Sequence, residues 1–230
     1  MKRLNTLGLL AVAAMAIAAF VGTTSASATT SGSFTSTEGA GKALVTEKIT
    51  QHVFTVTGAK TECKKVTFTG STEGAETTSQ SVTPDYKECT AFGLPATVTN
   101  TNCKIKLTAT TDKEGGHAEA HLEQANTAEG QPACQMQIVA KNIFGECVVD
   151  VNPQTVKGIH YVNNASPEDV KVQVTSGETM KAMVTKSTGV CPLTVKVPAE
   201  EHVTASYTGE ETVQATGGVQ FMEMASAGAP

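Results

Sequence analysis

One short segment places two histidines and two glutamates at alternating positions: His117-Ala-Glu119-Ala-His121-Leu-Glu123. On a β-strand these four side chains share one face, and the alanines and the leucine share the other. Imidazole and carboxylate groups are ligands for metals such as zinc. His117 and His121 would lie roughly 13 Å apart along a strand, so one ion could use only one of them. The candidate metal ligands are therefore His117, Glu119 and His121, and they would need a further ligand from another strand.

The neighbouring segment expected to form a strand, 103–109, offers lysines instead of ligands. Matching the apolar faces of the two strands places Lys106 opposite Glu119 and Lys104 opposite His121. A lysine in such a place is an ion-pair partner and not a metal ligand. We therefore expect a solvated face with cross-strand charge pairs, no bound metal and no cofactor.

Signals for nucleophilic catalysis are weak. The chain has no Gly-x-Ser-x-Gly motif, and Gly70-Ser71-Thr72-Glu73-Gly74 has its serine one place early and indicates a hairpin turn. His52, His160 and His202 could act as bases, but no activated serine or threonine is placed beside any of them. Each is expected to be an ordinary strand or turn histidine.

Paired carboxylates could serve a glycosidase, which needs two acids at a set distance. The pairs are Glu200-Glu201 and Glu210-Glu211, next to Pro198 and Gly209 respectively. Solvated turns are expected at both places, and exposed aromatics for sugar binding are few. We do not expect an enzyme, and a secreted hydrolase is the alternative.

Export is indicated by the N-terminus. Lys2 and Arg3 precede an apolar run from Leu7 to Val21, and Ala26-Ser27-Ala28 is a small-x-small cleavage signal. The run is shorter than the roughly 20 residues that span a bilayer. Residues 1–28 are thus expected to be a signal peptide, with no membrane span in the mature chain and a secreted, extracellular or cell-envelope location.

The composition of the mature chain argues against nucleic acid as a partner. Arg3 is the only arginine, so the mature chain has none, and its 15 Lys against 22 acidic residues give a net charge of −7. Tryptophan is absent. Nucleic-acid binding needs clustered basic charge and usually arginine or aromatic stacking, so it is not expected.

Six cysteines lie in the exported part: Cys63, Cys89, Cys103, Cys134, Cys147 and Cys191. No pair has the Cys-x-x-Cys spacing of a zinc or redox site, so three structural disulfides are expected, among 15 connectivities. If segments 134–140 and 147–151 are joined by a turn at 141–144, Ile138 faces Cys147 and Cys134 lies roughly 13 Å away from Cys147, too far for a disulfide. Cys63–Cys89 is the favoured pair, and the other four are left unassigned.

Short Val- and Thr-rich segments with alternating apolar and polar residues, separated by turn residues, predict an all-β antiparallel fold. The clearest are 103–109, 169–175 and 193–197. Further candidates are 43–48, 52–57, 64–70, 76–83, 96–100, 117–123, 134–140, 147–151, 158–163, 179–185, 203–208 and 211–216. The architecture expected is a disulfide-bonded sandwich or two packed β-subdomains.

The expected organisation has four parts. A signal peptide (1–28) precedes a flexible leader (29–41), whose small polar residues offer little to bury. The β domain covers 42–217, with its weakest internal boundary near 152–157. An edge segment beginning at Val219 and a flexible tail fill 218–230.

The chain resembles a group of exported bacterial β-rich proteins with six cysteines. The similarity covers roughly residues 53–217, and it is carried by Tyr86-Lys-Glu-Cys89-Thr-Ala-Phe92-Gly93, Cys103, Cys134, Cys147, Asn152-Pro153-Gln154, Gly158-Ile-His-Tyr161 and Tyr207-Thr208-Gly209. The resemblance implies secretion and a β fold, and no activity is assigned to that group. From all these features we expect a non-catalytic structural or binding module with an extracellular or envelope partner. The alternative is a hydrolase or metal-binding protein that uses the 117–123 face.

Overall fold

A computed structural model describes residues 32–111, 118–163, 169–177, 180–189, 191–193, 203–215 and 217–223. In these ranges the chain forms β-strands and no α-helix, which confirms the all-β class. The strands are β1 (Gly32–Ser36), β2 (Ala43–Lys48), β3 (His52–Val56), β4 (Ala59–Ser71), β5 (Glu76–Thr77), β6 (Ser79–Ala91), β7 (Leu94–Thr101), β8 (Cys103–Thr111), β9 (Ala118–Gln124), β10 (Gln135–Asn142), β11 (Gly145–Val151), β12 (Gln154–Asn163), β13 (Asp169–Thr175), β14 (Met180–Ser187), β15 (Val203–Ala215) and β16 (Val219–Glu223).

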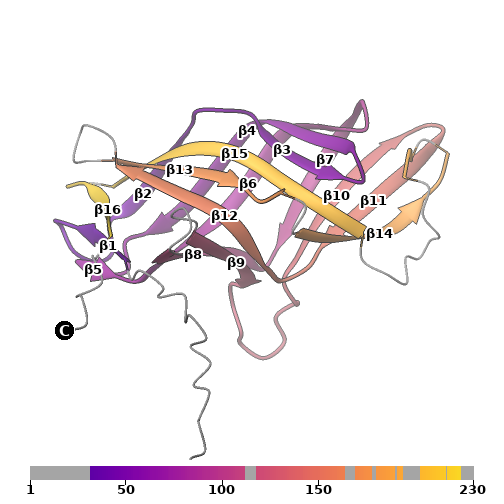
Figure 1. The fold of residues 1–230 in the computed structure, drawn as a ribbon. Coiled ribbons are helices and arrows are strands. Elements are labelled where there is room, and N and C mark those ends of the chain that lie inside the picture. Colours follow the sequence, from indigo (N-terminus) through magenta and orange to yellow (C-terminus); the bar gives the residue numbers. More distant parts are fainter. Residues whose placement is uncertain are drawn as a thin grey trace, which may run out of the picture.

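Thirteen of the described strands form one large antiparallel sheet, in the order β13-β12-β9-β8-β6-β7-β10-β11-β14-β15-β2-β4-β3. The sheet closes on itself, because β13 also pairs with β15, β15 with β3, and β4 with β6. Its walls enclose the core between them, in the sandwich-like manner expected. A small sheet, β16-β1-β5, lies at one end of the elongated molecule, and β10, β11 and β14 lie toward the other (Figure 1).

The longest strands in the described ranges are β4, β6 and β15, with 13 residues each. Strands β6 and β15 contribute to two separate hydrophobic clusters. One cluster gathers around β10, β11 and β14, and the other around β8, β9, β12 and β13. A third, small cluster surrounds the Cys63–Cys89 pair on β4 and β6. The clusters are thus joined by continuous strands. The boundary expected near 152–157 falls on the start of β12, which pairs with both β9 and β13.

Strand β9 shows how alternation of apolar and polar residues gives the sheet one buried face and one exposed face. Ala118, Ala120 and Leu122 are buried, while Glu119 and His121 are partly exposed on the opposite face, as predicted. The expected register was wrong by two residues, because His121 lies opposite Lys106 and Glu123 lies opposite Lys104. A register irregularity after Leu107 interrupts the β8–β9 ladder. A shift of two residues leaves every side chain on its expected face.

The pairing register of the β10–β11 hairpin also differs from the expected register by two residues. Asn142 pairs with Gly145, so the turn contains only Ile143 and Phe144, and Ala140 rather than Ile138 faces Cys147. The expected four-residue turn was therefore too long. A two-residue connection is the commonest hairpin geometry, and it shifts the register by two.

All six cysteines are in disulfides, which confirms that prediction. Cys63 and Cys89 are directly opposed on β4 and β6, with their Cα atoms 4.0 Å apart, as favoured from the sequence. The other two bonds join Cys103 to Cys134 and Cys147 to Cys191.

The leader expected to be flexible at 29–41 contains a strand. β1 pairs with β16 on one side and β5 on the other, and Phe34 is 6% exposed against the ring of Tyr161. Its short polar sequence contains one aromatic side chain to bury, and two neighbouring strands satisfy its backbone. The edge segment expected to begin at Val219 contains β16, which lies at the edge of the small sheet. The predicted signal peptide, the end of the 193–197 segment and the tail from 224 lie outside the described residues.

Candidate functional site

A cavity of about 130 Å³ lies where the hydrophobic clusters meet. Most of its wall is aliphatic or aromatic. The lining residues are His52, Phe54, Thr61, Cys63, Phe68, Val82, Tyr86, Val98, Ile105, Leu107, Ala120, Leu122, Met136, Ile138, Val151, Val156, Ile159, Val172, Val174, Met180, Tyr207, Glu211 and Val213. No lysine and no aspartate is among them. The cavity is thus an apolar space with one polar region.

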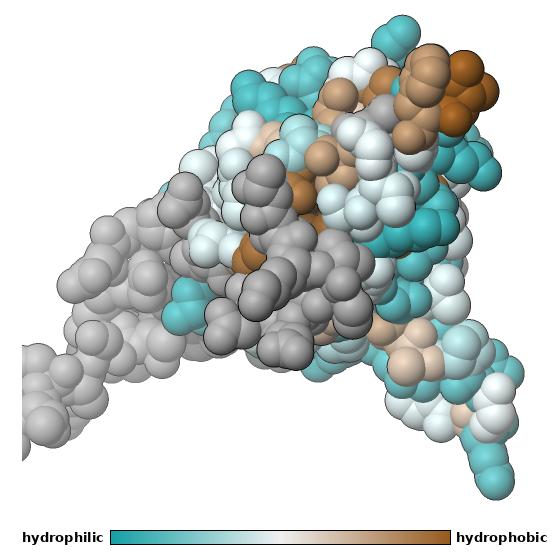
Figure 2. Space-filling view, turned by 90° about the vertical axis from the view of Figure 1, so that its right-hand side faces the viewer, coloured by the Kyte–Doolittle hydropathy of each residue, from teal (hydrophilic) through white to brown (hydrophobic). Residues whose placement is uncertain are grey.

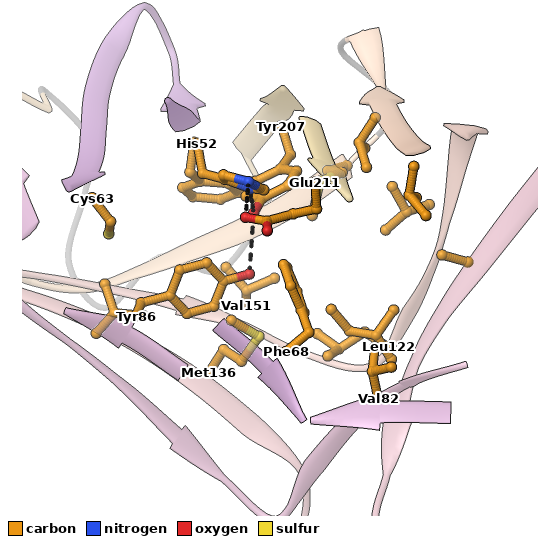
Figure 3. Close-up of a pocket in the computed structure, with 18 of the residues that line it drawn as sticks. His52, Cys63, Phe68, Val82, Tyr86, Leu122, Met136, Val151, Tyr207 and Glu211 are labelled. Carbon is orange, nitrogen blue, oxygen red and sulfur yellow. Dashed lines mark hydrogen bonds and ion pairs between the residues drawn. The ribbon is translucent and has the colours of Figure 1, made fainter. Parts of the chain in front are cut away.

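That polar region contains four side chains from three strands: His52 on β3, Tyr86 on β6, and Tyr207 and Glu211 on β15. His52 Nε2 lies 2.7 Å from Glu211 Oε1, and His52 Nδ1 lies 2.5 Å from the Tyr207 hydroxyl. The Tyr86 hydroxyl is 3.3 Å from that of Tyr207. Figure 3 shows these polar groups close together, with Phe68, Leu122 and Val82 below them. We call these four residues the polar cluster.

Burial of the contact between His52 and Glu211 is nearly complete, since their side chains are 2% and 4% exposed. Their nitrogen and oxygen approach to 2.7 Å without the alignment of a hydrogen bond. Neither Glu211 oxygen receives a hydrogen bond from any residue that the structure describes. A buried carboxylate in that condition is costly unless another donor reaches it.

Gly209 explains why the imidazole fits against β15. A Cβ atom at this position would collide with the ring of His52. The glycine therefore provides the space for His52 between Tyr207 and Glu211, in the middle of a continuous strand. Its neighbour Glu210 points to the other side, where Lys171 Nζ lies 3.1 Å from its carboxylate.

Burial sets the protonation of both tyrosines. Desolvation raises the pKa of Tyr86 to about 12, although the hydrogen bond with Tyr207 opposes this shift. Desolvation also raises the pKa of Tyr207 well above its ordinary value, and the nearby Tyr86 and Glu211 add to the shift. Both hydroxyls are therefore neutral at physiological pH and serve as hydrogen-bond donors and acceptors.

The arrangement resembles a carboxylate–imidazole–hydroxyl relay in its connectivity, but its chemistry differs. An activated nucleophile has a lowered pKa or a base that removes its proton readily. Here the surroundings disfavour the phenolate of Tyr207. The polar cluster is better suited to holding protons and orienting a hydrogen-bonding group than to attacking a substrate.

The metal candidates from the sequence lie elsewhere. Glu119 is 3.5 Å from Lys157 Nζ, and His121 Nδ1 is 3.0 Å from the Thr155 hydroxyl, both on the outer face of the sheet. His117 lies outside the described residues. Among the residues that the structure describes, no group of three or more His, Cys, Asp or Glu is arranged to hold a metal ion.

The sequence contained the components of the polar cluster without showing that they meet. The sequence predicts an ordinary strand or turn histidine at His52 and a solvated turn at Glu211, next to Gly209. That interpretation of Glu210-Glu211 was wrong, because both lie within β15 and Glu211 is buried. In the sequence, Tyr86 and the Tyr207-Thr208-Gly209 segment stand out only through the resemblance to exported six-cysteine proteins. His160 lies on β12, and Glu200, Glu201 and His202 are outside the described residues.

Two exposed hydrophobic side chains lie at the tip of the β10–β11 hairpin. Ile143 is 91% exposed and Phe144 is 75% exposed. Figure 2, a view of the right-hand side in Figure 1, shows a hydrophobic patch at the upper edge of the molecule. No helix in the described ranges has the length and apolar character needed to cross a membrane.

Comparisons of the chain with protein-family models, with curated proteins and with solved structures found no match.

Proposed function

We propose that this protein is a non-catalytic binding module that acts outside the cytoplasm and holds a small, largely apolar molecule in its central cavity. The observation that carries the proposal is the cavity itself, about 130 Å³ in volume and lined by residues of all three hydrophobic clusters. Protein interiors rarely contain empty spaces of this size. An engineered apolar cavity of about 150 Å³ is large enough to bind benzene.

Action outside the cytoplasm is supported by two features. The three disulfides are typical of an oxidising compartment. The N-terminal sequence has the basic head, apolar run and cleavage site of an export signal.

A binding role is favoured over hydrolysis by the state of the polar cluster. Its tyrosines have raised pKa values, so neither is an activated nucleophile. The outer face of β9 offers little support for a metal enzyme, because Glu119 is next to Lys157 there.

The test is saturable binding of toluene, followed by NMR of the methyl groups that line the cavity. We expect the unmodified protein to bind toluene and Ala120→Leu to lose most of this affinity. Ala120 is 3% exposed on the cavity wall, so the larger side chain occupies the space. Glu119→Gln, on the outer face of the same strand, is the matched control and should bind normally.

Circular dichroism must show that Ala120→Leu retains its sheet, and Val156→Leu provides a second variant at the facing position on β12. The proposal is rejected if neither toluene nor its hydroxylated analogue phenol binds saturably, or if both filled variants fold and bind toluene as tightly as the unmodified protein.

A further inference from the structure

The wall of the cavity contains a buried hydrogen-bond acceptor without a donor. Glu211 Oε2 receives no hydrogen bond from the residues that the structure describes, and the side chain is only 4% exposed. The large majority of buried polar side-chain atoms have at least one hydrogen-bond partner, and each oxygen of an ionised carboxylate can accept. This unsatisfied oxygen belongs to a residue that lines the cavity.

The neighbouring groups do not supply the missing donor. The Tyr207 hydroxyl is 2.5 Å from His52 Nδ1, and the Tyr86 hydroxyl is 3.3 Å from the Tyr207 hydroxyl. The tyrosines are thus engaged with His52 and with each other. Among the described residues, a donor for Glu211 would have to come from a molecule in the cavity.

The charge of that molecule is constrained by the lining of the cavity. The imidazole Nε2 lies 2.7 Å from Glu211 Oε1, so one oxygen of the carboxylate already has a close partner from the protein. The rest of the wall is mostly apolar, and a charged ligand would lose its hydration without further compensation there. A neutral O–H group fits these conditions best.

We infer that the cavity takes a small neutral molecule with an apolar body and one hydroxyl, and that this hydroxyl donates to Glu211. The inference rests on the proposed function. A volume of about 130 Å³ suits a body the size of a single six-membered ring. Phenol is the simplest such molecule, and toluene has nearly the same shape but no donor.

Toluene and phenol should bind in opposite orders of affinity to a wholly apolar cavity and to a cavity with a hydrogen-bond acceptor in its wall. In a wholly apolar cavity, toluene binds more tightly by roughly tenfold or more, because the phenol hydroxyl loses its bonds to water. With an acceptor in the wall, phenol should bind at least as tightly as toluene. Both dissociation constants can be measured by NMR titration of the unmodified protein, so this comparison needs no variant.

Glu211→Gln identifies the acceptor, because a neutral amide accepts more weakly than a carboxylate. We expect phenol to bind roughly tenfold more weakly to this variant, with toluene changed by less than about twofold. Glu210→Gln is the matched control. It removes a neighbouring carboxylate that pairs with Lys171, and it should leave both probes unaffected.

The outcomes separate the two proposals. If neither probe binds, the proposed binding function fails. If toluene binds and phenol binds at least tenfold more weakly, the binding function stands and the inference about the hydroxyl is overturned. If phenol binds well but Glu211→Gln leaves its affinity unchanged, the assignment of Glu211 as the acceptor is overturned.

Discussion

Raising the pH above 10 should unfold this protein through its buried tyrosines. The sequence has three tyrosines, and burial raises the pKa of each: Tyr86 to about 12, and Tyr161 and Tyr207 in the same direction. In the unfolded chain each loses its proton near pH 10. Between these values the unfolded state releases protons that the folded state retains, so the free energy of unfolding falls as the pH rises.

The size of the effect follows from the shift of Tyr86. Two pH units correspond to roughly 3 kcal/mol, and this contribution is fully present below pH 10 and lost as the pH rises toward 12. Tyr161 and Tyr207 add losses of the same sign. Because a domain has only about 5–15 kcal/mol of stability in total, the protein should unfold cooperatively within or just above this pH range.

The absorbance of tyrosinate can be measured without overlap from tryptophan, because the chain contains none. We expect tyrosinate to form in one steep step that coincides with loss of the β-sheet signal in circular dichroism. The protein in denaturant is the control and should titrate gradually near pH 10. Tyr86→Phe should lose less stability across the same range. Tyrosinate formation near pH 10 with an intact sheet would refute the reasoning.

Three further predictions concern stability measured by denaturant unfolding. Replacing Cys147 and Cys191 by alanine should cost about 4 kcal/mol, because the bond closes a 44-residue separation, and a loss below about 1 kcal/mol would contradict this. Gly209→Ala should cost about 1–3 kcal/mol, because its Cβ meets the ring of His52, and unchanged stability would show that the ring moves freely. Phe144→Ser should change stability by less than about 0.5 kcal/mol, because that side chain is 75% exposed, and a larger loss would indicate unrecognised packing.

The strands were largely predictable because alternation of apolar and polar residues directly reflects the geometry of a half-buried sheet. Strand β2 has the bounds expected from the sequence, and β9 has the expected faces. The pairing registers were harder to predict, because they depend on the length of each turn. A slip of two residues also leaves the apolar and polar residues on the same faces, so alternation does not reveal it. This is why the partners of Lys106 and Cys147 were each displaced by two positions.

The polar cluster was not predictable for a different reason. His52 and Glu211 are far apart in the sequence, and they meet only because the sheet closes through the pairing of β3 with β15. Gly209 also gave the wrong local signal. Glycine usually marks a turn, but here its missing side chain makes room for an imidazole ring. From the sequence alone, a glycine that makes room for a neighbouring side chain cannot be distinguished from a glycine that allows an unusual backbone conformation.

The position of β15 has a consequence for the order in which the molecule can form. This strand pairs with β13 and β14, which precede it closely in the chain, and with β2 and β3, which come from near its beginning. The wall around the cavity therefore remains incomplete until residues 203–215 have been synthesised. Contacts between such distant segments also make folding slow. A chain that is still being synthesised would lack these pairings, and a truncation before residue 203 should leave the edges of several strands unpaired.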